Sequence, residues 1–190
     1  MDLHTENKGI GVPEIRTARL ILRQPRAQDA AVVTEAINNY DVSRWLAVVP
    51  YPYAQSDAEW FIGECAKGAF TAWNIWAGQQ FIGTIGLDDD LGYWLAEDAW
   101  GHGYATEAAR AIVNHHFVTS EADNLKASYF LGNTGSQNVL TKLGFVPTKA
   151  IRQNSKAQGK DVDAQLMCLT RLRWQELCHD SPELPRSARG

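Results

Sequence analysis

Apolar side chains recur along the chain in two periods, which predict both helices and strands. From Ala105 to Phe117 they return every three or four residues, the spacing of one helix face. Helices are also expected over Ala30–Asn38 and from Ser56 to about Lys67, and a short one is expected from Asn133 or Ser136 to Lys142. Shorter apolar stretches predict strands over residues 19–23, 70–76, 81–87, 92–95, 126–131, 145–152 and 162–171. This mixed order predicts an α+β fold around one twisted, mixed but mostly antiparallel sheet of six to seven strands, with about four flanking helices.

Local sequence signals place the ends of these elements. Asp29 is expected to cap the first helix, and Ser56 with Glu59 to form a capping box for the second. Asn133 or Ser136 is expected to cap the short helix before Gly144. The stretches 70–76 and 81–87 predict a hairpin, and the apolar positions on both faces of 162–171 predict an interior strand.

The bulk properties restrict the class of protein. A chain of 190 residues with 45% hydrophobic content suits one domain, and the net charge of -4 argues against a nucleic-acid partner. No apolar run is long enough for a bilayer, and the first residues are too polar for a signal peptide. Three scattered cysteines predict reduced thiols without a zinc site, which suits the cytoplasm. We expect a flexible arm over 1–14, one domain over 15–176 and a disordered tail over 177–190.

The stretch Gly92–Ala108 carries the first candidate site, because a strand, a glycine turn and a helix follow one another there. Gly101 and Gly103 allow a sharp turn, and a helix that starts directly after it presents free N–H groups to an anion. The turn lacks the Lys of a P-loop, and Thr106 occupies the place of the third small residue of a dinucleotide loop. A glycine-capped core helix that binds nothing is the alternative.

The turn resembles a known cofactor loop. Gly103 and Ala105 match the pattern R/Q-x-x-G-x-G/A of the acetyl-CoA pyrophosphate loop in GNAT acetyltransferases, while Trp100 replaces the usual Arg or Gln. The form Trp-Gly-x-Gly-Tyr-Ala-Thr-Glu-Ala is similar to that of the ribosomal-protein N-terminal acetyltransferase branch. His102 stands where Lys or Arg is frequent, and a nearly neutral imidazole adds little attraction for phosphate.

A second motif lies one strand downstream. Residues 133–145 resemble the GNAT segment Asn-x-x-Ser-x-x-x-Leu-x-Lys-x-Gly-Phe, with matches at Asn133, Ser136, Leu140, Lys142 and Gly144–Phe145. Two partial matches in the order that the family requires make the resemblance extend from about Arg16 to Trp174.

The resemblance implies a cofactor site. In GNAT proteins the strands equivalent to 92–95 and 126–131 run parallel and splay apart around the pantetheine arm of acetyl-CoA. The arm would then pair with the main chain of Tyr93, Trp94 and Leu95. The pyrophosphate would meet the loop formed by Gly101, His102, Gly103, Tyr104, Ala105 and Thr106. Asn133, Ser136 and Asn138 would contact the pantetheine and thiol end. No metal is expected, and Asp88–Asp90 reads as a solvated turn.

The implied chemistry is direct attack of an amine on the thioester. A main-chain N–H near Trp94 or Leu95 could polarise the carbonyl. Ser136 is the candidate proton donor to the departing thiolate, and a helix cap is its alternative role. Many GNAT enzymes use a Tyr there, and none is expected nearby. The general base stays open among Glu64, Asp88, Glu97, Asp163 and a water chain.

These observations favour an acetyl-CoA-dependent N-acetyltransferase. The acceptor would be a protein N-terminus or a small amine, and the protein a monomer or homodimer. The aromatic segment Tyr40–Tyr53 is one wall of an acceptor cleft or, alternatively, a loop packed over the core. A non-catalytic acyl-CoA-binding module and a binder of a different nucleotide or phosphate are the competing hypotheses.

Overall fold

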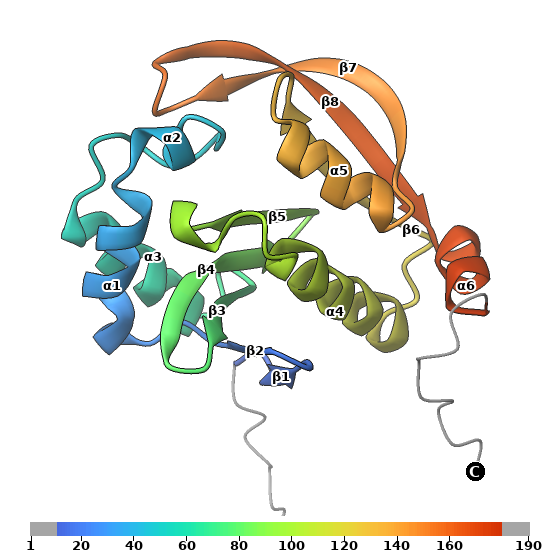
Figure 1. Cartoon of the computed structure of the whole chain (residues 1–190), viewed down its shortest axis with the longest axis horizontal. Helices are drawn as coiled ribbons and strands as arrows, with labels where there is room; N and C mark the ends of the chain where they lie inside the picture. The colour runs from blue at the N-terminus through green and yellow to red at the C-terminus, as the bar shows by residue number, and fades with distance from the viewer. Residues whose placement is uncertain (1–10, 180–190) are drawn as a thin grey trace, which may run out of the picture.

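The computed structural model describes residues 11–179, which form one mixed sheet with helices on both of its faces (Figure 1). Within these residues the sheet has eight strands in the order β1-β2-β3-β4-β5-β6-β8-β7. The strands are β1 Ile15–Arg16, β2 Leu20–Arg23, β3 Ala72–Ala77, β4 Gln80–Leu87, β5 Asp90–Leu95, β6 Asn124–Phe130, β7 Val146–Ser155 and β8 Lys160–Thr170. The predicted fold class is confirmed, and the additional strand is the short β1, which pairs antiparallel with β2.

Six α-helices lie among the described residues 11–179. They are α1 Ala30–Ile37, α2 Tyr40–Ser43, α3 Gln55–Ala66, α4 Tyr104–Thr119, α5 Thr134–Lys142 and α6 Arg171–His179. Helices α2 and α6 were not predicted. Trp174 holds α6 in place, because its ring stacks on Phe117 at 5.2 Å and its Nε1 donates to Asn114 Oδ1 at 2.8 Å. Both partners belong to α4, far away in the chain, so no local sequence pattern predicts this helix. None of the helices described over residues 11–179 is long and apolar enough to cross a membrane.

The predicted ends of the domain are partly corrected. Residues 177–179, expected in the tail, belong to α6. At the other end, Trp73 Nε1 donates to the carbonyl of Pro13 at 2.8 Å, so the last part of the expected arm is attached to the sheet. The rest of these two segments, 1–10 and 180–190, lies outside the described residues.

Two hydrophobic clusters cover the two faces of the sheet. The larger one surrounds α4, whose Ala108, Ile112 and Phe117 are buried against the strands. The smaller one joins α1 and α3 to β4 through Val33, Ile62 and Phe81. Successive residues of a strand face opposite sides, so β5 sends Tyr93 to the α4 cluster and Trp94 to the α1–α3 cluster. Figure 1 shows these helix groups on either side of β3–β5.

Two of the predicted helix caps are not formed, and the third prediction is confirmed for one of its two candidates. Asp29 does not cap α1, because its carboxylate accepts two hydrogen bonds from Arg23 at 2.8 and 2.9 Å and one from the Arg26 N–H. The second helix begins one residue early, at Gln55, where Asp57 accepts from the Ala54 N–H at 2.9 Å in place of a Ser56–Glu59 box.

At the third start, Asn133 is the cap, since its Oδ1 accepts from the Ser136 N–H at 3.0 Å. Ser136 is therefore not the cap, and its hydroxyl is left for another partner. The helix after it ends as predicted, with Gly144 at φ 91°.

Strand pairing confirms the central prediction about the sheet. β5 and β6 are parallel, but they pair only at Asp90–Lys126 and Leu91–Ala127. Beyond these pairs β5 runs on to Leu95 and β6 to Phe130, so the strands part. The hairpin of β3 with β4 and the interior position of β8 are confirmed as well.

Candidate active site

The open edge of β5 is the first part of the site. Ala96 N–H donates to the Ile82 carbonyl at 2.9 Å, and Thr84 pairs with Trp94, so the main chain of Trp94 is turned toward β4. Because main-chain groups alternate along a strand, those of Tyr93 and Leu95 point to the opposite edge, toward β6. That edge has lost its partner strand after Leu91. Of the three predicted main-chain contacts, Tyr93 and Leu95 face the gap and Trp94 does not.

The glycine turn lies at the end of this edge. Gly101 and Gly103 have φ values of 79° and 80°, and α4 starts directly after them at Tyr104. Gly103 is the N-cap and carries no side chain to satisfy the first turn, so the N–H groups of residues 104–106 lack a cap. A Cβ on Gly101 would meet no heavy atom within 4 Å, so the turn is also open on that side. The arrangement fits an anionic group at the helix start.

Side chains from outside the motif hold the turn. Trp100, in place of the family's Arg or Gln, donates from Nε1 to the Leu95 carbonyl at 2.9 Å and so ties the turn to the end of β5. Arg19 donates to the His102 carbonyl at 3.0 Å, and its guanidinium lies 4.7 Å from the centre of the Tyr104 ring. The imidazole of His102 stacks on the same Tyr104 ring, with 5.6 Å between the ring centres. No local signal in the sequence linked Arg19 to the turn.

The start of α5 faces the gap from the other side. Tyr93 Oη lies 3.0 Å from Ser136 Oγ and 3.3 Å from the Ser136 carbonyl oxygen, so its single proton has two acceptors within reach. Burial raises the pKa of Tyr93 to about 12, although the hydrogen bond with Ser136 opposes the shift. Asn133 is half-buried beneath Ser136, whereas Asn138 is exposed farther along the helix. The expectation that no Tyr lies near Ser136 was wrong, because the nearby phenol comes from β5 rather than from α5.

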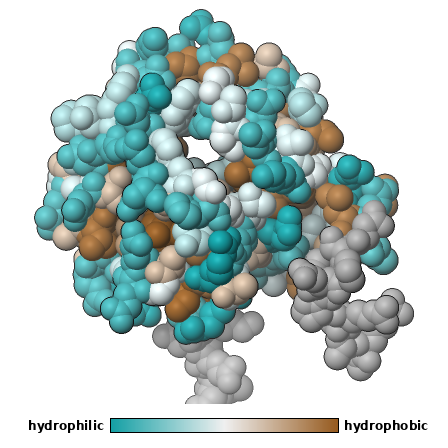
Figure 2. Space-filling view, viewed as in Figure 1, coloured by the Kyte–Doolittle hydropathy of each residue, from teal (hydrophilic) through white to brown (hydrophobic). Residues whose placement is uncertain are grey.

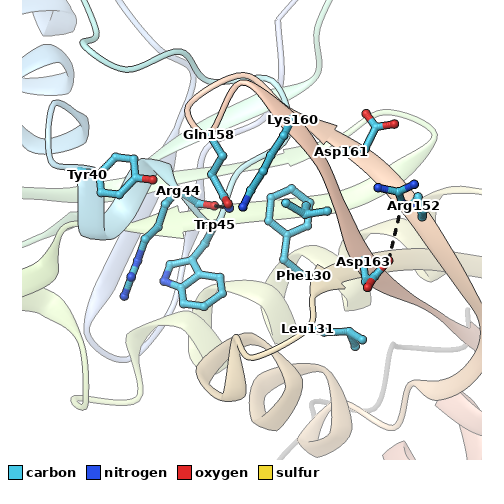
Figure 3. A pocket seen from close by; sticks show the side chains of 11 residues that line it. Tyr40, Arg44, Trp45, Phe130, Leu131, Arg152, Gln158, Lys160, Asp161 and Asp163 are labelled. Carbon is cyan, nitrogen blue, oxygen red and sulfur yellow. Dashed lines mark hydrogen bonds and ion pairs between the residues drawn. The ribbon is translucent and has the colours of Figure 1, made fainter.

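A cavity of about 470 Å³ adjoins this region (Figure 3). Three segments line it: Tyr40, Arg44 and Trp45 around α2, Phe130 and Leu131 at the end of β6, and Arg152, Gln158 and Lys160–Asp163 from the β7–β8 hairpin. The predicted wall from the segment 40–53 is thus present in part. A Cβ on Gly132 would lie 3.7 Å from Trp45, which places the cavity wall beside the start of α5.

The β7–β8 hairpin closes over the cavity by contacts with the α2 segment. Gln158 Nε2 donates to the Arg44 carbonyl at 2.7 Å, and Lys156 N–H donates to the Ala47 carbonyl at 3.0 Å. Ser155 Oγ donates to the Leu46 carbonyl at 3.4 Å. Figure 2 shows the surface hollowed into an opening near β5, below the arch of this hairpin in Figure 1.

The four candidate bases now differ in their surroundings. Glu64 pairs with Lys67 on α3 at 2.8 Å, Asp88 accepts from the Thr71 N–H, and Glu97 accepts from Asn39 Nδ2 at 2.6 Å. Asp163 lines the cavity, where it lies 3.7 Å from Arg152. Of the four carboxylates, Asp163 is the one among the residues that line the cavity. Among residues 11–179 no group of His, Cys, Asp or Glu side chains is arranged to hold a metal.

The site thus combines a sheet that is split between two parallel strands, a helix start suited to an anion, and a pair of hydroxyl groups between β5 and α5. The chain belongs to the acetyltransferase (GNAT) domain family, whose sequence model matches residues 19–146. The enzyme is accordingly an acyltransferase, which favours catalysis over the alternative of a non-catalytic binding module.

Individual relatives agree with this assignment. The chain is 26% identical to the uncharacterized N-acetyltransferase YoaA of Bacillus subtilis (strain 168) over 174 residues, covering 85% of this chain and 98% of that protein. A GNAT-family acetyltransferase structure from Bacillus anthracis superposes with a TM-score of 0.74 at 18% identity, covering 83% of this chain and 98% of the other. The ribosomal L7/L12 α-N-protein acetyltransferase RimL, solved with coenzyme A, has a TM-score of 0.71 at 15% identity, covering 83% and 98%. Ribosomal-protein acetyltransferases are thus among the structures with the same fold.

Proposed function

We propose that the enzyme transfers the acetyl group of acetyl-CoA to a primary amine. The observation that carries the proposal is the open edge of β5, which leads from the Tyr93–Ser136 pair to the uncapped start of α4. An extended thiol-bearing arm with a pyrophosphate at its far end has the shape and charge that this edge and this helix start suit. RimL, which shares the fold, was solved with coenzyme A.

Most of the predicted contacts have a role in this proposal, and the exposed Asn138 has none. Tyr93 and Leu95 offer main-chain groups to the pantetheine arm, and the N–H of Leu95 faces the gap as a donor to the thioester oxygen. The turn from Gly101 to Thr106 receives the pyrophosphate. Asn133 holds the start of α5, so that Ser136 can donate to the leaving sulfur. Trp94 contributes its side chain to the opposite face rather than its main chain.

The acceptor amine enters from the cavity between α2, the end of β6 and the β7–β8 hairpin. Trp45 and Phe130 supply apolar walls, and Asp163 is a carboxylate to which the attacking amine can pass its proton. The RimL likeness suggests a protein N-terminus as the acceptor, with a small-molecule amine as the other possibility. A cavity of this volume suits a few residues of a peptide or one small molecule.

Incubation of the full-length protein with acetyl-CoA and a panel of amines tests the proposal. The panel contains a peptide with an N-terminal serine, the same peptide with a blocked N-terminus, a polyamine and an aminoglycoside. We expect release of free thiol together with a mass increase of one acetyl group on at least one free amine. Binding of acetyl-CoA without transfer to any amine would defeat the proposal.

The control variant is Thr141→Ala, which removes an exposed hydroxyl from the same helix as Ser136. It should keep the activity of the native enzyme, whereas Ser136→Ala should lose it with acetyl-CoA binding retained.

A further inference from the structure

The side chain of Tyr93 has no role so far, although it makes the closest polar contact across the gap. Its phenol lies 3.0 Å from Ser136 Oγ and 3.3 Å from the Ser136 carbonyl oxygen. Its ring packs against the core cluster around α4, which fixes the direction in which the phenol points. The Ser136 main chain is fixed too, since its N–H donates to Asn133 Oδ1. What stays free in this pair is the direction of the two hydroxyl protons, that of Tyr93 and that of Ser136.

We propose that Tyr93 is a positioning residue, whose phenol donates its one proton to Ser136 Oγ at 3.0 Å in preference to the Ser136 carbonyl oxygen at 3.3 Å, and thereby leaves the serine proton to the gap between β5 and β6. The inference rests on the proposed function and assigns a second residue to the same chemistry. A lone serine hydroxyl near a helix start could donate to several acceptors, the phenol among them. A phenol that donates to one lone pair of Oγ is no longer available as an acceptor for the serine proton.

Acidity decides which hydroxyl donates. A phenol is a stronger acid than an aliphatic alcohol, so in a shared contact the phenol is the better donor. Burial raises the pKa of Tyr93 to about 12, so the phenol keeps its proton throughout the neutral and mildly alkaline range. A thiol, with an ordinary pKa of about 8.5, is a stronger acid than this phenol. Tyr93 therefore orients and polarises Ser136 without surrendering its proton to the sulfur.

The step balances without a further reactant. Acetyl-CoA, when bound, supplies a thioester whose carbon forms a bond to the amine nitrogen as its bond to sulfur breaks. The amine releases one proton to Asp163 or to water. Ser136 donates a hydrogen bond to the sulfur, which carries the negative charge until solvent protonates it, and Tyr93 strengthens that hydrogen bond from behind. The net reaction consumes one amine and yields one amide and one thiol.

The pKa of the coenzyme A thiol in its complex with the full-length protein tests the proposal without an acceptor. Coenzyme A labelled with ¹³C beside the sulfur reports the titration through its chemical shift. We expect the bound thiol pKa to lie about one unit below that of free coenzyme A, because a donated hydrogen bond stabilises the thiolate. Ser136→Ala should abolish this difference, and Tyr93→Phe should remove about half of it. Thr141→Ala should leave it unchanged.

The double variant separates positioning from simple support of the fold. If Tyr93 acts through Ser136, Tyr93→Phe should have no further effect on the thiol pKa once Ser136 is alanine, and Ser136→Thr should retain the shift. In turnover with the best amine of the panel, Tyr93→Phe should lower kcat about three- to tenfold with the KM for acetyl-CoA unchanged.

A thiol pKa in Tyr93→Phe equal to that of the native protein would overturn the inference, even if the protein acetylates amines. A larger KM with unchanged kcat would overturn it as well, because a residue that only supports the pocket has that signature. Failure of coenzyme A to bind at all would defeat the proposed function and the inference together.

Discussion

Arg19 and Glu107 join the residue directly before β2 to the first turn of α4, with Arg19 Nε 2.7 Å from Glu107 Oε2. The other carboxylate oxygen accepts from the Arg19 N–H at 2.9 Å and from Thr17 Oγ1 at 2.6 Å. The same guanidinium donates to the His102 carbonyl within the glycine turn. Because the carbonyl and the N–H of one peptide unit point in opposite directions, fixing the His102 carbonyl also fixes the direction of the Gly103 N–H. The contact therefore links the shape of the proposed pyrophosphate site to β2.

Arg19→Ala should weaken coenzyme A binding about two- to tenfold, because the turn loses the partner of its His102 carbonyl. Isothermal titration calorimetry of the full-length protein measures the effect. Arg16→Ala is the matched control, since Arg16 pairs with Glu14 at the surface and its side chain is 67% exposed. Equal affinities for the Arg19 and Arg16 variants would contradict a role of Arg19 in shaping the turn.

Asp29→Asn should lower the free energy of unfolding at neutral pH by about 3–5 kcal/mol. The substitution leaves the largely buried guanidinium of Arg23 without its charged partner. It also disturbs a buried row in which Asn74 donates to Asp29 at 3.0 Å and Thr84 donates to Asn74 at 3.1 Å. Urea denaturation measures the loss. Arg173→Ala breaks an exposed pair with Glu176 and should cost less than about 1 kcal/mol.

The stability of the native protein should fall in acid because of the same carboxylate. Burial alone would raise the pKa of Asp29, but hydrogen bonds from Arg23, Arg26 and Asn74 and the charge of Arg23 hold it below its ordinary value. A depressed pKa means that the contribution is complete above the unfolded value, about 3.9, and is lost as the pH falls through the folded value. Thermal unfolding between pH 7 and pH 2 should show the loss beginning near pH 4. Asp29→Asn should flatten this dependence, and a curve parallel to that of the native protein would speak against the assignment.

Asp163→Asn should reduce kcat about a hundredfold with the acceptor found in the panel, if Asp163 takes the proton of the amine. Steady-state rates as a function of pH measure the effect, and a more alkaline reaction medium should partly restore the rate by deprotonating the amine. Glu64→Gln is the control, because Glu64 pairs with Lys67 on α3. Full activity of Asp163→Asn would indicate that the proton leaves through water instead.

Trp45→Ala should raise the KM for the acceptor and leave coenzyme A affinity unchanged. Trp45 lines the cavity and its ring lies 4.8 Å from the Arg44 guanidinium, so its loss removes one wall of the acceptor space. Trp60→Ala serves as the control, since Trp60 is 61% exposed on α3 outside the cavity. An unchanged acceptor KM in Trp45→Ala would place the acceptor elsewhere.

Most of the elements could be predicted because their signals are local. The helix after the glycine turn was predicted from its apolar period over Ala105–Phe117 and runs over Tyr104–Thr119, since this period and the glycine start lie within one segment. The Asp29 cap failed because other side chains competed for its carboxylate. Asp29 carries a suitable carboxylate for a cap, yet the guanidinium of Arg23 and the amide of Asn74 bind it more favourably.

The candidate site divides in the same way. The main-chain part, Tyr93–Leu95 with the turn 101–106, was predicted from the family resemblance and the glycine positions, and the strand pairing then turns Trp94 away from the gap. The side-chain part does not. Tyr93 lies 43 residues from Ser136, and Arg19 lies 83 residues from the His102 carbonyl to which it donates. The cavity wall formed by Arg44, Gln158 and Lys160 also depends on the docking of a distant hairpin.

The sequence by itself determined the α+β class, the glycine turn before α4 and the place of Ser136 at the start of α5. These features depend on hydrophobic period and backbone preference, which act over a few neighbouring residues. Only the tertiary structure decided that β5 and β6 part after Leu91, that Asn133 rather than Ser136 caps α5, and that the freed serine hydroxyl meets the phenol of Tyr93. Such contacts arise when packing brings distant segments together. The spacing of apolar and polar residues in the sequence does not predict which side chains then come within hydrogen-bonding distance.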